Sequence, residues 1–433
     1  MSPALPQADR GVVAYIHHTF PSRTATFVYR EMAAVRDAGV EMLNIACKRP
    51  EPDAVHAEAR KYVAETVYLP GTAHPLLYVR AMGSFLRHPA LFTRLARQVL
   101  GAAGRGRLSR AFGEVVRGGC LAAELRRRPR VSHVHAPFST EVATIALMAA
   151  QLEKRRFSFT SHTAFDADLI AEKVRLAQFA VSISGFDRER LVEAAGASDR
   201  DKIHVIHCGV DGAGAAERRE QEDPPILLCV GSLIEKKGHE VLLRACALLK
   251  ERGMKFECRI AGDGPLKPAL AAQARSLGIE GCTVFAGACD QETVRSLYEQ
   301  ARVFALPSVY ASNGDLDGIP VVLMEAMAAG VPCVSTQVSG IPELIESPKE
   351  GLLVEEKNPA ALADALEKLL RDRALREDIA LAAREKVRRE FNVRRSAAEL
   401  SELFRQSIEM EGRASSRPSR MGTAATTKRG PPS

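Results

Sequence analysis

The sequence lacks several features that would assign it to a particular class of protein. It contains no tryptophan, and none of its nine cysteines forms a Cys-x-x-Cys pair. A disulfide framework or a structural zinc site is therefore not expected, and burial as free thiols in a reducing compartment is the prediction. Most of the cysteines lie in apolar, strand-like runs, at positions Cys47, Cys120, Cys208, Cys229, Cys246, Cys258, Cys282, Cys289 and Cys333.

Targeting and membrane-spanning segments are not recognisable either. The first ten residues lack the basic-then-apolar order of a signal peptide, and no uninterrupted apolar run reaches the roughly 18 residues that a spanning helix needs. The sequence therefore predicts a cytoplasmic protein. Its 433 residues, 46% hydrophobic and 26% charged, are typical of a soluble globular protein with two or three domains.

Positive charge is concentrated in one segment. Residues 80–130 contain twelve arginines but only the acids Glu114 and Glu124, whereas the whole chain carries a net charge of +7. Residues 75–130 are predicted to be amphipathic helices, interrupted near 101–106. A solvated face and a basic surface that docks on an anionic membrane both remain open, and the imbalance favours the membrane. Nucleic-acid binding is not expected, because no recognition module or interleaved aromatic residues accompany the arginines.

Strand and helix patterns alternate along the chain. An apolar strand pattern at 11–16, a helix pattern ending before Gly39 and a second strand pattern at 41–46 predict a βαβ unit of a parallel sheet. The predicted organisation is an N-terminal α/β domain at 1–211, a linker at 212–225, a second α/β domain at 226–390, a helix at 391–411 and a disordered basic tail at 412–433.

The most informative stretch is Asp315–Thr336. Gly318 permits a tight turn, Pro320 suits the first position of a helix, and the helix pattern that follows is apolar except for Glu325. A helix start suits an anion such as a diphosphate, and a single carboxylate in an apolar helix is costly to bury unless something binds it. The stretch therefore predicts a nucleotide site, with an ordinary satisfied buried glutamate as the alternative.

This stretch resembles the C-terminal motif of the retaining glycosyltransferases of family 4, in which an acid, seven further residues and a glutamate precede Ala-Met-Ala and Gly-x-Pro. The acid pair here is Asp317 and Glu325. The resemblance implies an α/β GT-B fold, with two Rossmann-like, doubly wound domains facing each other across a cleft. It also implies that Glu325 binds the ribose of a nucleotide-sugar donor and that Asp317, which replaces the family's usual glutamate, contacts the transferred sugar.

The resemblance extends to other predicted site residues. Lys237 matches the family's phosphate-binding lysine, Ser232 stands where an arginine is usual, and His162 matches a histidine that faces the transferred sugar. Catalytic roles are thus predicted for His162, Asp317 and Lys237. Donor binding is predicted for Glu325, Lys237, Gly231, Ser232, Gly318, Ile319, Pro320, Val321, Val322 and, against the nucleobase, Ala288. His135 is a weaker candidate, because it and His133 fit a simple strand position.

The N-terminal region resembles, within this family, the colanic-acid-type exopolysaccharide glycosyltransferases. The match covers Thr19-Phe-Pro, Thr26-Phe-Val and Glu31, with Ala25 at a position that is commonly glutamate; Cys208-Gly-Val-Asp211 is similar to the family's N-G-V-D junction. The implied function is metal-independent, retaining transfer of a hexose from a UDP- or GDP-sugar to a glycan or lipid-linked acceptor, in the cytoplasm or at the inner face of the membrane. No metal or other cofactor is expected, because the D-x-D pair Asp315 and Asp317 precedes a helix start and has no evident third ligand.

Two alternatives remain open. A nonhydrolysing sugar-nucleotide epimerase shares the two-domain architecture but needs acid and base residues that are not evident here. A catalytically silent protein that binds a nucleotide sugar or a lipid is compatible with the replacements at Ala25, Cys208, Ser232 and Asp317.

Overall fold

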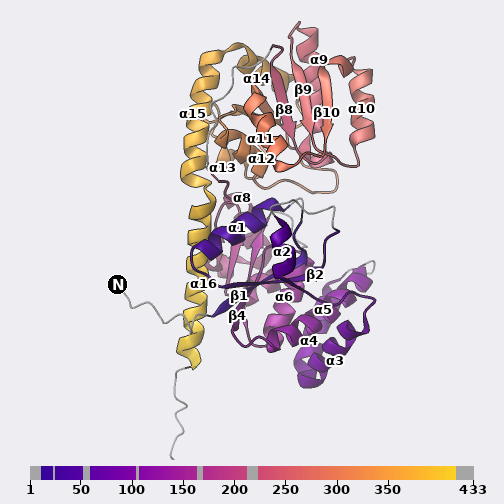
Figure 1. The fold of residues 1–433 in the computed structure, drawn as a ribbon, viewed down its shortest axis with the longest axis vertical. Helices are drawn as coiled ribbons and strands as arrows, with labels where there is room; N and C mark the ends of the chain where they lie inside the picture. Colours follow the sequence, from indigo (N-terminus) through magenta and orange to yellow (C-terminus); the bar gives the residue numbers. More distant parts are fainter. Residues whose placement is uncertain are drawn as a thin grey trace, which may run out of the picture.

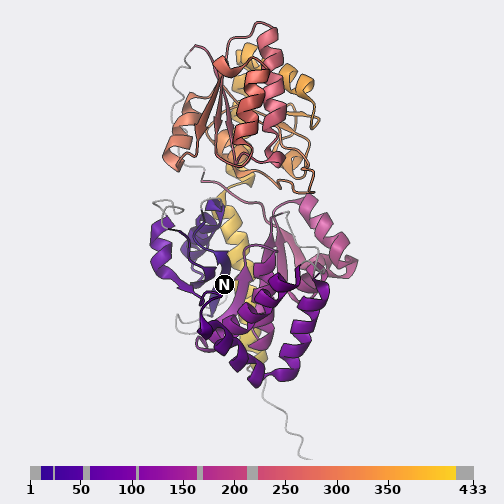
Figure 2. The same ribbon diagram turned by 90° about the vertical axis from the view of Figure 1, so that its right-hand side faces the viewer.

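The computed structural model describes residues 11–22, 25–51, 59–103, 107–162, 169–211 and 223–415. The chain forms two α/β domains, one above the other in Figure 1, and the helices α15 (Arg373–Glu390) and α16 (Val393–Ser415) run as a column along one side of both. In the view turned by 90°, helices cover the sheet of each domain (Figure 2).

The N-terminal domain contains a seven-stranded parallel sheet in the order β3-β2-β1-β4-β5-β6-β7. Its strands are β1 (Val12–Thr19), β2 (Met42–Lys48), β3 (Thr66–Tyr68), β4 (Val131–Ala136), β5 (Arg156–Ser161), β6 (Phe179–Ser182) and β7 (Ile203–Val205). Its helices are α1 (Thr26–Asp37), α2 (Arg60–Glu65), α3 (Pro75–Arg87), α4 (Pro89–Ala102), α5 (Leu108–Arg126), α6 (Glu141–Leu152), α7 (Ile170–Leu176) and α8 (Gly185–Ala195).

Strand β1 lies inside this sheet, between β2 and β4, and is buried on both faces. Val13 and Tyr15 pack into a cluster that includes α1 and α16, whereas Ala14 and Ile16 pack into a second cluster with α5 and α6. Successive side chains of a strand point to opposite faces, so a strand that is covered on both sides must be apolar throughout. This explains the uninterrupted apolar run at the start of the domain.

The C-terminal domain contains a six-stranded parallel sheet in the order β10-β9-β8-β11-β12-β13. The strands are β8 (Ile226–Val230), β9 (Glu257–Ala261), β10 (Thr283–Gly287), β11 (Val303–Leu306), β12 (Cys333–Thr336) and β13 (Leu352–Val354). The helices are α9 (His239–Glu251), α10 (Lys267–Ser276), α11 (Gln291–Gln300), α12 (Val321–Ala328), α13 (Ile341–Leu344), α14 (Pro359–Arg371) and α15. Two parallel, Rossmann-like α/β domains are thereby confirmed.

Helix α16 leaves the C-terminal domain and completes the core of the N-terminal one. Phe404 is fully buried, with its ring centroid 5.9 Å from that of Tyr15 and 5.3 Å from that of His133. The Ser407 hydroxyl lies 2.8 Å from Nδ1 of His133. The helix continues to Ser415, so the prediction of a disordered tail from residue 412 is wrong for 412–415; residues 416–433 lie outside the described part.

The cysteines behave as predicted. All nine are free thiols, and seven of them are buried, with Cys282 and Cys289 partly exposed. Most of the predicted linker, residues 212–222, lies outside the described residues, and the second domain begins with β8 at Ile226.

Candidate functional site

A cavity of about 770 Å³ lies between the two domains. The N-terminal domain contributes the start of α1 and the residue after β5, and the C-terminal domain contributes loops that follow its strands and the start of α12. Only the weaker candidate His135 does not line this one cavity, whereas all the predicted catalytic and donor-binding residues do: His162, Gly231, Ser232, Lys237, Ala288, Asp317, Gly318, Ile319, Pro320, Val321, Val322 and Glu325. The structure therefore brings the candidates together, while their individual roles stay predictions.

Helix α12 presents one polar group to the cavity. Its residues Leu323, Met324, Ala326 and Met327 are buried in the C-terminal core, and the opposite side, which carries Glu325, lines the cavity. Pro320 occupies the N-cap position instead of the first helical position, with φ −64° and ψ 122°. The first N–H groups of a helix have no partner within the helix and carry a partial positive charge, so this end of α12 suits an anionic group.

Glu325 is held by groups from both domains. Nη1 of Arg30 on α1 donates to Oε1 of Glu325 at 2.8 Å, and the Tyr298 hydroxyl lies 3.4 Å from Oε2. The glutamate side chain is 22% exposed, so its carboxylate remains accessible from the cavity. Glu325 therefore has the position predicted for a ribose-binding residue, and it also anchors an ion pair between the domains.

Lys237 and Asp317 form a second ion pair in the cavity. Nζ of Lys237 lies 2.7 Å from Oδ2 of Asp317, and the Ser308 hydroxyl is 3.4 Å from the same oxygen. Nζ of Lys236 lies 3.1 Å from Asp315 and 3.7 Å from Asp317. Both carboxylates of the D-x-D pair are thus engaged by lysines.

Gly238 allows the lysine loop to reach this position. Its φ is +68°, and a Cβ atom there would lie 1.8 Å from the carbonyl oxygen of Pro307. Only glycine fits so close to another backbone segment in this left-handed conformation. The contact fixes the short 3-10 helix Glu235–Lys237 against the end of β11 and thereby orients Lys237 toward Asp317.

His162 follows β5 directly and enters the cavity from the N-terminal domain. Its ring centroid lies 4.7 Å from that of Phe27 and 5.1 Å from that of Phe138, and Nδ1 lies 3.7 Å from Sγ of Cys208. Burial lowers the pKa of His162 to about 4, so the imidazole is neutral near pH 7. A neutral ring can both donate a hydrogen bond and accept one, and it adds no charge to the cavity.

His135 is not part of this site. It is fully buried on β4, accepts or donates a hydrogen bond with Ser158 at 2.8 Å, and packs against Phe404. His133 is equally buried, and desolvation lowers its pKa to about 3. These histidines belong to the core between the sheet and α16, which excludes His135 from the cavity lining.

Residues 214–386 match the family described as glycosyl transferases group 1. This segment is a glycosyltransferase group 1 domain. Two curated relatives match part of the chain. The amylovoran biosynthesis glycosyltransferase AmsK of Erwinia amylovora is 39% identical over 206 residues, which are 47% of this chain and 51% of AmsK. The putative colanic acid biosynthesis glycosyltransferase WcaL of Escherichia coli is 40% identical over 208 residues, which are 47% of this chain and 51% of WcaL. The chain thus spans about half the length of the curated relatives it matches.

Solved structures share the fold over most of the chain, including the glycosyltransferase group 1 domain. A glycosyltransferase from Rickettsia africae superposes with a TM-score of 0.69 at 17% identity and covers 93% of this chain and 99% of its own. Anabaena HepE in complex with UDP-glucose superposes with a TM-score of 0.67 at 15% identity, and the match covers 92% of this chain and 100% of HepE. The fold is GT-B, as the resemblance implied.

Sequence reasoning missed several residues of the cavity. Arg30 lies on an amphipathic helix, where an arginine is indistinguishable in sequence from a solvated one. Asp263 and Asp290 follow strands β9 and β10, and their position after a strand was the available signal. Thr26 and Phe27 belong to the N-terminal motif, but nothing in that motif showed that they would face the C-terminal domain.

Proposed function

We propose that the protein is a retaining, metal-independent glycosyltransferase that moves a hexose from a nucleoside-diphosphate sugar to a glycan or lipid-linked acceptor. The observation that carries the proposal is the interdomain cavity, in which an anion-binding helix start, the lysine Lys237 and the carboxylate Glu325 meet. Its volume of about 770 Å³ lies within the range typical of small-molecule sites.

Each group in the cavity has a role in this proposal. Glu325 accepts hydrogen bonds from the ribose hydroxyls, and Lys237 and the first N–H groups of α12 bind the diphosphate. When the glycosidic bond to the donor phosphate breaks, negative charge grows on that diphosphate, and charges fixed in advance stabilise it without reorganisation. The engagement of Asp315 and Asp317 by lysines supports a mechanism that uses those lysines in place of a metal ion.

Asp317 and His162 complete the proposed mechanism on the sugar side. Both line the cavity, one from each domain, and they orient the hexose by hydrogen bonds to its hydroxyls. The attacking acceptor hydroxyl passes its proton to the departing phosphate oxygen on the same face of the sugar, which gives retention at the anomeric carbon. The biological context is surface-polysaccharide synthesis, supported by the named roles of AmsK and WcaL.

Substitution of Glu325 tests the donor site. We expect Glu325→Ala to weaken the binding of UDP or GDP at least tenfold, because the loss of hydrogen bonds to a charged group costs about 1.5–3 kcal/mol. Isothermal titration of the wild-type protein and of Glu325→Ala with UDP, GDP and their sugars measures the change in affinity. Unchanged affinity would remove the assignment of Glu325.

A turnover assay distinguishes an active glycosyltransferase from a protein that only binds nucleotide sugars. Wild-type protein incubated with a panel of UDP- and GDP-sugars and a lipid-linked glycan acceptor should release the nucleoside diphosphate from one of them and yield a product with retained anomeric configuration. Tight binding of UDP without any turnover would instead support a catalytically silent nucleotide-sugar-binding protein. Turnover that requires an added divalent cation would contradict metal independence.

We further propose that the protein docks on the inner face of the membrane through α3 and α4. None of the helices in the described part of the chain is both long and apolar enough to cross a bilayer. Helix α3 nevertheless exposes Val79, Met82 and Leu86, at 65%, 55% and 70%. These residues are spaced three and four apart, so they form one apolar stripe, as in helices that lie on membrane surfaces.

The arginines of this region fall into two groups. Arg80, Arg110, Arg126, Arg128 and Arg130 pair with acids, three of which, Glu41, Glu141 and Glu153, lie outside the segment 80–130. The pairing leaves a smaller uncompensated charge than the sequence count implied.

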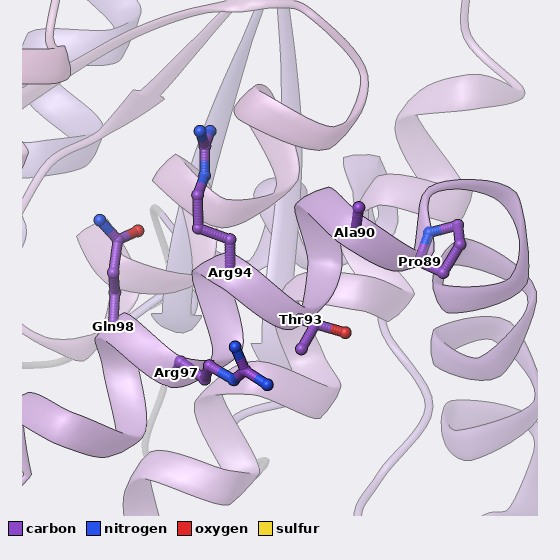
Figure 3. Close-up of a pocket in the computed structure, with 6 residues that line it drawn as sticks. All are labelled: Pro89, Ala90, Thr93, Arg94, Arg97 and Gln98. Atoms are coloured by element: carbon purple, nitrogen blue, oxygen red, sulfur yellow. The ribbon is translucent and has the colours of Figure 1, made fainter.

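Arg94 and Arg97 on α4 belong to the second group and form no ion pair with any described residue. They line a shallow depression, and Arg94 extends from the same side of α4 as Gln98, one helical turn later (Figure 3). Anionic lipid attracts such arginines by about 1 kcal/mol each.

Removal of the apolar stripe tests membrane docking. The triple variant Val79→Ser, Met82→Ser and Leu86→Ser should bind vesicles of phosphatidylglycerol and phosphatidylcholine at least tenfold more weakly than wild type in co-sedimentation, because burial of each side chain is worth up to about 1.5–3 kcal/mol. Leu381→Ser is the matched control, since Leu381 is similarly exposed but lies on α15. Equal binding of the triple variant and wild type would contradict docking through α3.

A further inference from the structure

We infer that Arg30 is a further donor-binding residue: it leaves Glu325 when the ribose hydroxyls bind there and then contacts the donor's diphosphate. This inference rests on the proposed function. Arg30 is the single arginine among the described residues that line the cavity, and it comes from the N-terminal domain. Its side chain is 13% exposed and reaches across to Glu325 at 2.8 Å.

The charge balance of the cavity favours such a residue. The described lining carries three cations, Arg30, Lys236 and Lys237, against four carboxylates, Asp263, Asp290, Asp317 and Glu325. His162 is neutral there near pH 7, because burial lowers its pKa to about 4. The lining is thus short of positive charge for a ligand that itself carries two or more negative charges.

The two lysines do not remove this shortage. Lys237 is paired with Asp317 at 2.7 Å, and Lys236 is shared between Asp315 and Asp317. Each lysine is therefore partly neutralised by its ion pair. Arg30 is held at 2.8 Å by Glu325, the group that the ribose hydroxyls engage in the proposed function, and Asp211 also acts on its charge. Ribose binding weakens the hold of Glu325 on the guanidinium, so that more of its positive charge acts on the ligand in the cavity.

The released guanidinium has only a short distance to move. Val321, at the start of α12, lies one helical turn from Glu325 on the same side, and side chains four residues apart are about 5–6 Å from each other. Rotation within the arginine side chain covers that distance. A guanidinium binds phosphate oxygens through two parallel hydrogen bonds, which the lysines cannot do.

Arg30→Met tests this inference, because methionine has a similar length but no charge. The measured quantity is the ratio of the dissociation constant of the nucleoside to that of the nucleoside diphosphate, from isothermal titration with uridine and UDP and with guanosine and GDP. This ratio isolates the contribution of the diphosphate. We expect Arg30→Met to lower the ratio at least tenfold relative to wild type, since a hydrogen bond to a charged group contributes enough for that change.

Glu325→Gln is the matched control. It breaks the same 2.8 Å ion pair but keeps the guanidinium, so the ratio should stay within threefold of wild type even if both affinities fall. A ratio that is unchanged in Arg30→Met, while wild type binds UDP or GDP, would overturn the role of Arg30 and leave the proposed function intact. A ratio that falls equally in both variants would show that the ion pair itself matters, and would also overturn it. Wild-type protein that binds neither diphosphate would overturn the proposed function together with this inference.

Discussion

Replacing Lys237 by alanine should lower the rate of sugar transfer about 10²–10³-fold, the loss typical when one preorganised group that stabilises developing charge is removed. Lys237 lies in the interdomain cavity, 14% exposed and fixed by Asp317. Its charge is therefore in place before the reaction begins. Single-turnover measurement of nucleoside diphosphate release separates this effect on the chemical step from an effect on donor affinity.

Further variants determine what Lys237 does. Lys250→Ala changes an exposed lysine of the neighbouring helix α9 and should leave the rate unchanged. In Lys237→Ala with Asp317→Asn, the carboxylate that the lysine neutralises is removed as well, and the reference is Asp317→Asn alone. If Lys237 acts on the diphosphate, the double variant is about 10²–10³-fold slower than Asp317→Asn. A double variant as fast as Asp317→Asn would instead show that Lys237 only neutralises Asp317.

The second large effect is expected on stability, from Phe404→Ala. Phe404 is fully buried among Tyr15, His133, His135 and Phe179, so its removal leaves a cavity in the N-terminal core. Truncation of a buried phenylalanine costs about 3–5 kcal/mol in the free energy of unfolding. Hydrogen exchange of the amides in β1 and β4 measures this locally, which matters because a two-domain chain need not unfold in one step.

The matched control for Phe404→Ala is Leu381→Ala, in the same column of helices. Leu381 is 72% exposed, so its truncation should change stability by no more than about 0.5 kcal/mol. Protection of β1 and β4 that is the same in Phe404→Ala as in wild type would show that α16 does not stabilise the N-terminal sheet.

How well a feature could be predicted depends on how far apart in the sequence the residues that determine it lie. The turn at Gly318, the helix α12 and Glu325 lie within one short stretch, so local pattern and resemblance were enough to place them in a nucleotide site. Strands β3 and β13 contain three residues each and were not predicted, because so few residues show no periodicity. The parallel sheets themselves were predictable, since strands buried on both faces are apolar throughout.

Long-range pairs were not predictable. Arg30 and Glu325 are 295 residues apart, and neither neighbourhood indicates the other. The same holds for the arginines of 80–130, whose charge is partly compensated by Glu41, Glu141 and Glu153 from outside that segment. His133 and His135 could be assigned to the core only once α16 was seen to cover them. In each case the missing information was which side chains the fold brings into contact.

The position of α16 has a consequence for how this protein is made. A growing chain folds from its N-terminus as it leaves the ribosome, yet one face of the first sheet is covered only in part, by α1, until Phe404 has been synthesised. At common elongation rates the intervening residues take about 10–40 s. During that interval Tyr15 and Phe179 are exposed on a nascent, half-covered sheet, where a chaperone can bind them. A chain truncated within the second domain would therefore contain two incomplete domains and no functional half.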